Sequence, residues 1–123
     1  MPTILIVDDE KELRLLYQKE LEARDYNVFT AGSLQETKEL FAGVNFDLMV
    51  IDIRLAEKES GLDVLRWIRR LNKDIPIIIN SAYPSYKLDF STWLADEYIV
   101  KSGDLDELVK AIEKLTKKSK NKQ

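Results

Sequence analysis

The stretch that decides the fold is Thr3-Ile4-Leu5-Ile6-Val7, which leads directly into Asp8-Asp9-Glu10. It is a continuous aliphatic run, and such runs are typical of strands that are buried on both faces. Similar runs follow at residues 48–51 and 75–79, and shorter strand candidates lie at 27–30 and 97–100. Together they predict a parallel sheet enclosed between two layers of helices.

The segments between these runs have helical periodicity. Leu13, Leu16, Tyr17 and Leu21 recur at helical spacing, and similar apolar stripes lie at residues 34–44, 64–71 and 105–115. Capping-box patterns at Ser33-x-x-Glu36 and Asp104-x-x-Glu107 mark two helix starts. The aromatic stretch 84–96 predicts a further, short helix. We therefore expect an α/β (βα)5 fold with five parallel strands in the doubly wound order 2-1-3-4-5.

Composition narrows the chemistry. The 123 residues are 45% hydrophobic, enough for one domain with a core, and they include neither Cys nor His. This excludes disulfides, Cys/His zinc sites, thiolate nucleophiles and a Ser-His-Asp triad. Carboxylates, hydroxyls, Lys and Arg remain, and these groups suit hard cations and phosphate.

Charge is unevenly distributed along the chain. The tail at 117–123 holds four of the 19 basic residues and no acid, which leaves 15 basic against 22 acidic residues elsewhere. An acidic body argues against nucleic-acid binding by this domain. The chain lacks both a secretory pattern and an apolar run of the roughly 18 to 20 residues that span a bilayer. We expect a cytoplasmic, stand-alone protein with one domain over 1–116 and a disordered, lysine-rich tail over 117–123; a linker to a further domain is the alternative reading of that tail.

Polar residues gather where the predicted strands end: Asp8-Asp9, Asp52, Ser81 and Lys101. Ligands of open α/β sheets bind at the carboxyl ends of the strands, so these side chains are expected on one rim. Each has an ordinary alternative, with Asp9 as a helix N-cap, Ser81 as a turn cap and Lys101 as a solvated lysine. Because all four strand ends carry groups of complementary chemistry, a shared functional site explains them better than these separate ordinary roles.

The chemistry of that rim follows from its charges. Three carboxylates repel one another unless a cation intervenes, and oxygen-only ligands suit Mg²⁺. A lysine opposite them suits a phosphoryl oxygen. A carboxylate at such a site can attack phosphorus and become an aspartyl phosphate.

The order and spacing of these motifs resemble the receiver domain of two-component response regulators over residues 2–116. The resemblance rests on Asp8-Asp9, Asp52, Ser81-Ala82, Tyr98-Ile99-Val100-Lys101 and the stretch Ser60-Gly61-Leu62-Asp63-Val64-Leu65. It implies a flavodoxin-like fold. It also implies a signalling switch in a phosphorelay that catalyses only its own phosphorylation and dephosphorylation.

The resemblance also implies roles for single residues. Asp52 would be the phosphoacceptor and would bind Mg²⁺, or Mn²⁺ in its place, together with Asp9 and the backbone carbonyl of Arg54. Asp8 would act on the metal mostly through water. Lys101 would pair with the phosphoryl group.

Further roles concern the switch and the lifetime of the phosphate. Ser81 would move to hydrogen-bond the phosphoryl group, and Tyr98 would turn inward with it. Ala82 is small enough to leave access to the phosphate. Arg54 and Tyr83 would tune its lifetime by shielding it from water.

The resemblance places this chain in one half of a relay. A histidine kinase or a histidine phosphotransfer domain would supply the phosphohistidine that a chain without His lacks. An output protein or a dimer partner would bind the face formed by residues 84–96, 97–100 and 105–115. One departure from the family pattern is Ser102 after Lys101, where the family has proline after a cis bond, so either a costly cis bond is retained or the loop differs.

Three alternatives differ in what they require. A receiver-like scaffold that works without phosphorylation keeps the fold and loses the chemistry. A phosphohydrolase with an Asp nucleophile needs an acid two residues after it, where this chain has Arg54. A flavin-binding domain needs a phosphate loop after the first strand, where Asp8-Asp9-Glu10 would repel phosphate.

Overall fold

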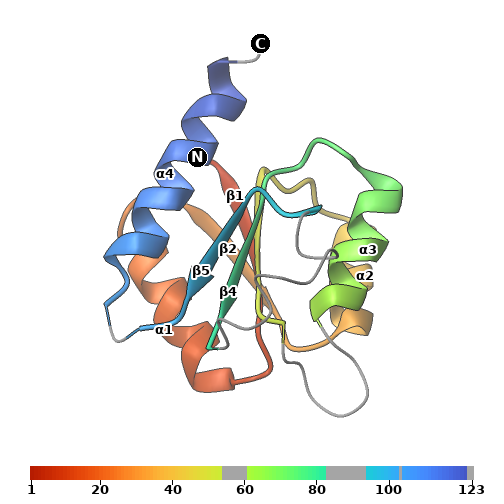
Figure 1. Cartoon of the computed structure of the whole chain (residues 1–123), viewed down its shortest axis with the longest axis horizontal. Helices are drawn as coiled ribbons and strands as arrows, with labels where there is room; N and C mark the ends of the chain where they lie inside the picture. The colour runs from red at the N-terminus through yellow and green to blue at the C-terminus, as the bar shows by residue number, and fades with distance from the viewer. Residues whose placement is uncertain (54–60, 83–93, 103, 122–123) are drawn as a thin grey trace.

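Five parallel strands form one sheet in the order β2-β1-β3-β4-β5, which confirms the predicted topology (Figure 1). The computed structural model describes residues 1–53, 61–82, 94–102 and 104–121. The strands are β1 (Thr3–Val7), β2 (Asn27–Ala31), β3 (Leu48–Ile51), β4 (Ile77–Ser81) and β5 (Glu97–Val100).

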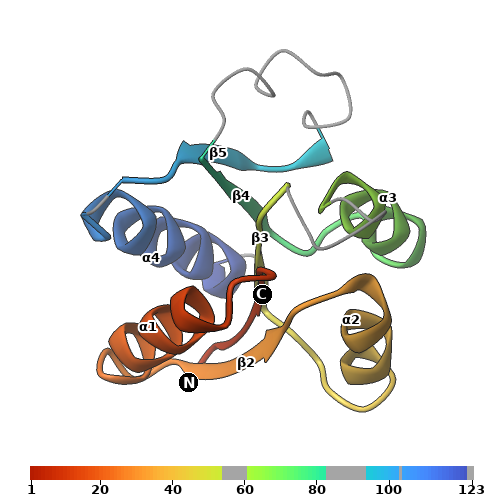
Figure 2. The same ribbon diagram turned by 90° about the horizontal axis from the view of Figure 1, so that it is seen from below.

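Helices cover both faces of the sheet. Figure 2 shows α1 (Lys11–Glu22) and α4 (Asp106–Asn121) on one face, and α2 (Leu34–Phe41) and α3 (Gly61–Leu71) on the other. Successive residues of β1 enter opposite cores: Ile4 and Ile6 pack on the α1/α4 side, and Leu5 and Val7 on the α2/α3 side. Burial on both faces explains why the strands are continuous apolar runs.

The helix starts follow the capping patterns in part. The Ser33 hydroxyl accepts a hydrogen bond from the backbone N–H of Glu36 at 3.1 Å, as the capping box predicts. Asp104 instead accepts from the N–H of Asp106 at 2.9 Å, and α4 begins at that residue. The short helix predicted within 84–96 lies outside the described residues, which resume at Leu94.

Two boundaries differ from prediction. β4 begins at Ile77 and not at Ile75, because Pro76 has no N–H to donate and the N–H of Ile75 donates to Asn72 Oδ1 at 3.0 Å. The expectation of a disordered tail is wrong up to Asn121, because α4 continues to that residue. Lysines are good helix formers, they interact favourably with a helix C-terminus, and no Gly or Pro intervenes to end the helix. In the described part of the chain, no helix is both long and apolar enough to cross a membrane.

Candidate functional site

The register of the sheet brings the ends of β1 and β3 side by side. Val7 pairs with Ile51, so the next residues, Asp8 and Asp52, are neighbours at the carboxyl edge. The N–H of Asp52 donates to the carbonyl of Val7 at 2.9 Å. On the other side, the N–H of Lys101 donates to the carbonyl of Ser81 at 2.7 Å. The structure thus gathers the predicted strand-end residues at one edge.

Three carboxylates converge at this edge. Asp8 and Asp52 are buried, with 2% and 6% of their surface exposed, while Asp9 is exposed. Each offers an oxygen within 4.8 Å of those of the other two. Glu10, not Asp9, is the N-cap residue of α1, so the alternative of Asp9 as a helix cap is wrong.

Lys101 lies between the two buried carboxylates. Its ammonium nitrogen is 2.8 Å from Oδ2 of Asp8 and 2.8 Å from Oδ2 of Asp52. Burial alone would lower the pKa of this ammonium, but the hydrogen bonds and charges of Asp52 and Asp8 outweigh burial and hold the pKa above its ordinary value. With 13% of its side chain exposed, Lys101 is not the solvated lysine of the alternative reading.

The residues predicted for the switch lie on β4 and β5, the two strands that lead to Ser81 and Lys101. Ser81 is completely buried at the end of β4, and Ala82 beyond it is exposed. Tyr98, half-buried on β5, packs against the core on the α2/α3 side and pairs with Ile79 of β4. Arg54 and Tyr83 lie outside the described residues, so the structure bears on neither of their predicted roles.

The loop after Lys101 differs from the family pattern. The described residues contain no cis peptide bond, so the bond from Lys101 to Ser102 is trans. The Ser102 hydroxyl donates to the carbonyl of Asp104 at 3.0 Å. Lys101 therefore reaches both carboxylates without the cis bond.

The donor set fits a hard divalent cation. Every side chain that offers a ligand in this cluster is a carboxylate, and the chain has no Cys or His to add sulfur or imidazole nitrogen. Mg²⁺ binds one or two carboxylates, keeps several waters and prefers oxygen ligands. Asp8, Asp9 and Asp52 are the side chains of this cluster that could hold such an ion.

Two residues that were not predicted as part of the site support it. The N–H of Gly61 at the start of α3 donates to the carbonyl of Ile53, next to Asp52. A side chain at this glycine would collide with the backbone of Asp52 and Ile53. Arg14 donates from its guanidinium to the backbone carbonyl of Asp8 at 2.6 Å. The spacing of Arg14, one helical turn after the acidic loop, is the signal that could have identified it.

A buried polar pair lies on the α1/α4 side of the sheet. The amide of Asn80 on β4 donates to the hydroxyl of Tyr17 on α1 at 3.2 Å, and both residues are buried. Burial raises the pKa of the Tyr17 phenol, and the hydrogen bond from Asn80 opposes this only in part. The pair joins α1, which follows the acidic loop, to the strand that ends at Ser81.

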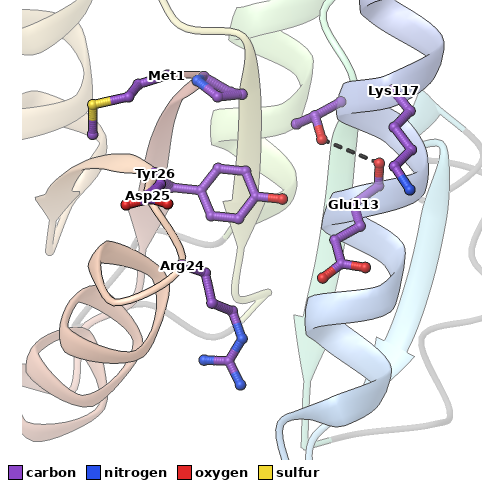
Figure 3. A pocket seen from close by; sticks show the side chains of 8 residues that line it. Met1, Arg24, Asp25, Tyr26, Glu113 and Lys117 are labelled. Atoms are coloured by element: carbon purple, nitrogen blue, oxygen red, sulfur yellow. Dashed lines mark hydrogen bonds between the residues drawn. The ribbon is translucent and has the colours of Figure 1, made fainter.

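A pocket of about 320 Å³ lies near the amino-terminal ends of β1 and β2, away from the carboxyl edge that holds the site. It is bounded by the first residues of the chain, the turn after α1 and the last turns of α4, as Figure 3 shows. Its lining residues are Met1, Pro2, Arg24, Asp25, Tyr26, Glu113, Thr116 and Lys117. None of the predicted site residues lines this pocket, so its size carries no weight in locating the chemistry.

Comparison with known proteins gives the family. Residues 4–113 match the model of the response regulator receiver domain. The chain is 34% identical over 113 residues to the transcriptional regulatory protein ZraR of Escherichia coli (strain K12), covering 90% of this chain and 25% of ZraR. It is 32% identical over 123 residues to the response regulator ArlR of Staphylococcus aureus (strain Mu50), covering 99% of this chain and 56% of ArlR. The chain therefore spans about a quarter of one relative and just over half of the other.

Solved structures agree with this assignment. The response regulator TrrA of Thermotoga maritima, in complex with Mg²⁺-BeF, is 43% identical and superposes with a TM-score of 0.88. The match covers 94% of this chain and 99% of that one. TrrA in complex with the histidine kinase ThkA matches at the same identity with a TM-score of 0.86, covering 94% of this chain and 98% of that one. With its sheet order, its carboxyl-edge cluster and these matches, the chain belongs to the response regulator receiver domain family of two-component signalling.

Proposed function

We propose that this receiver domain accepts a phosphoryl group on Asp52 from a phosphohistidine, with Mg²⁺ bound by Asp9 and Asp52. The observation that carries the proposal is the buried Asp52 carboxylate held 2.8 Å from the Lys101 ammonium, beside two further carboxylates. A buried carboxylate with a fixed cation at one oxygen is a positioned nucleophile.

The transfer step is a displacement at phosphorus. A carboxylate oxygen of Asp52 forms a bond to phosphorus while the phosphorus–nitrogen bond of the donor breaks, and the electron pair of that bond stays with the imidazole. Lys101 donates to the oxygens on which negative charge is concentrated. Bound Mg²⁺ would supply the remaining neutralisation of the phosphoryl oxygens. Hydrolysis by water later returns Asp52 and inorganic phosphate.

The partner and the switch belong to the same proposal. TrrA, a relative of this chain, forms a complex with a histidine kinase, which supports a histidine kinase or phosphotransfer domain as the donor. We assign the response to Ser81 and Tyr98, which lie on the adjacent strands β4 and β5. Signalling in the cytoplasm, Mn²⁺ as a substitute for Mg²⁺, and an output or dimer partner on the face that includes β5 and α4 complete the proposal.

Phosphorylation by a small acyl phosphate tests the proposal. Mixed with Mg²⁺ and this donor, the protein should gain one phosphoryl mass, and neither Asp52→Asn nor a sample with chelator should gain it. Asp63→Asn is the matched control, because Asp63 is an exposed carboxylate on α3. The proposal fails if the wild type gains no phosphoryl group, which would favour the scaffold alternative. It fails equally if Asp52→Asn is modified as fast as the wild type.

A further inference from the structure

The peptide group between Asp8 and Asp9 is held by a side chain from α1. The guanidinium of Arg14 donates to the Asp8 carbonyl oxygen at 2.6 Å, a short bond of the charge-assisted kind. Arg14 is half-buried, and its own N–H donates to the carbonyl of Glu10 at 3.1 Å. The side chain therefore folds back from the first turn of α1 onto the acidic loop.

Asp8 has three other anchors. Its N–H donates to the carbonyl of Ala31, Oδ1 accepts from the N–H of Glu10, and Oδ2 accepts from Lys101. These bonds fix Asp8 itself. Its carbonyl, however, belongs to the peptide group that leads into Asp9, and Arg14 is what holds that carbonyl.

Asp9 depends on this peptide group. Its exposed carboxylate forms no hydrogen bond or ion pair with any residue of the described ranges. Since no partner holds this carboxylate, the backbone sets the position of its Cβ and the rotamers that are open to it. The orientation of the peptide between Asp8 and Asp9 therefore limits how closely the Asp9 carboxylate can approach Asp52.

We propose that Arg14 is a positioning residue for the metal site, acting through the Asp8 carbonyl to aim the Asp9 carboxylate. This inference rests on the proposed function, since it takes Asp9 as a magnesium ligand. Groups that orient metal ligands from behind typically change metal affinity by about 10- to 100-fold when they are removed.

Gly32, just after β2, provides the space for this side chain. A Cβ at Gly32 would lie 2.8 Å from Nη1 of Arg14 and 3.3 Å from its guanidinium carbon. Because the far end of an arginine moves easily, Gly32→Ala displaces the guanidinium and leaves its charge and the backbone in place. It is a second way to break the contact.

Charge alone predicts that the loss of Arg14 changes the Mg²⁺ affinity in the opposite direction. The guanidinium is positive and lies near a site for a cation, so its charge opposes Mg²⁺ binding. If charge were its main effect, Arg14→Met would bind Mg²⁺ more tightly than the wild type. A positioning role predicts weaker binding.

Calorimetric titration of the full chain with MgCl₂, without a phosphoryl donor, separates these outcomes. We expect Arg14→Met and Gly32→Ala each to raise the Kd for Mg²⁺ about 10-fold. Arg24→Met is the matched control, because it removes an exposed arginine, paired with Glu20 at 3.1 Å, beyond the far end of α1. Its Kd should stay within about twofold of the wild type.

Two results overturn the inference: an unchanged or tighter Kd for Arg14→Met, or an unchanged Kd for Gly32→Ala. Urea unfolding of each variant identifies any loss of folding, and Gly32→Ala keeps the test open if Arg14→Met does not fold. A wild type that binds no Mg²⁺ refutes the proposed function instead. Amide hydrogen exchange at Glu10, measured in metal-free protein, then still tests whether Arg14 holds the acidic loop. If Arg14 holds this loop, the Glu10 amide should exchange faster in Arg14→Met than in the wild type.

Discussion

Gly61→Ala offers a direct test of how α3 supports Asp52, the proposed phosphoacceptor. A Cβ at this buried glycine would lie 2.7 Å from the carbonyl carbon of Asp52, 2.8 Å from Cα of Ile53 and closer still to the Asp52 carbonyl oxygen. Carbon atoms pack at about 3.5 to 4.0 Å, so the carbon contacts alone would force the backbone apart by roughly 0.8 Å, and the closer oxygen contact requires more. The colliding atoms belong to the backbone, which cannot rotate away as a side chain can.

The expected cost has two parts. Alanine is a better helix former than glycine by about 1 kcal/mol, which favours the variant. Forcing atoms into a packed region costs about 1 to 3 kcal/mol and occasionally more, and here the collision is with two residues at once. We expect the free energy of unfolding to fall by about 2 kcal/mol. Displacing a reacting group by about 1 Å costs roughly 10²-fold in rate, so phosphorylation of Asp52 should slow by about 10- to 100-fold.

Urea unfolding measures the first effect, and mass spectrometry of the phosphorylated protein over time measures the second. Gly43→Ala is the matched control, because a Cβ there meets nothing within 4 Å. It should leave both quantities close to those of the wild type. The reasoning would be refuted by a Gly61→Ala protein as stable as the wild type and phosphorylated at the same rate.

Three further substitutions test separate parts of the molecule. Lys101→Met should tighten Mg²⁺ binding in calorimetry, because the Lys101 ammonium competes for the oxygens of Asp52 and Asp8. The same substitution should slow phosphorylation about 10²-fold. A Mg²⁺ affinity equal to that of the wild type would contradict the competition. Because folding raises the Tyr17 pKa, its neutral form contributes stability that is complete below about pH 10 and is lost as the pH rises through the folded pKa. Tyr17→Phe should therefore lose stability less steeply above pH 10 in urea titrations, and a slope equal to that of the wild type would count against the shift. Ser33→Ala should lower the free energy of unfolding by about 1 kcal/mol without slowing phosphorylation, and an unchanged urea midpoint would deny the cap a role.

The strand-end residues of the site could be predicted from the sequence, because each buried strand is a continuous apolar run that ends at a polar residue. A buried strand that ends in Asp8 and another that ends in Asp52 must place their carboxylates at one edge of a parallel sheet. Lys101 follows for the same reason. The residue type of Ser102 favours a trans bond, because a cis bond before a non-proline residue is costly, but only the structure shows that Lys101 still reaches both carboxylates from it.

Other features were hidden because their partners lie far apart in the chain. Tyr17 belongs to a periodic apolar stripe in the sequence, which predicts an apolar core contact. In the structure its hydroxyl accepts a hydrogen bond from the Asn80 amide, 63 residues away in the chain. The spacing of Arg14 after the acidic loop makes a contact with that loop possible, but only the structure shows that its side chain folds back onto the Asp8 carbonyl. Nothing in the sequence around Gly61 shows that a side chain is excluded there; the requirement for glycine arises only because α3 lies against the backbone of Asp52.

By itself, the sequence determined the strand positions, the parallel sheet and the carboxylates at its edge. These follow from local patterns: continuous apolar runs bury both faces of a strand, and residue types at strand ends are read directly. The tertiary structure alone decided that Lys101 joins Asp8 and Asp52, and that Arg14 and Gly61 support the acidic residues. Those contacts depend on the register between strands and on the close approach of helices, which no local pattern encodes.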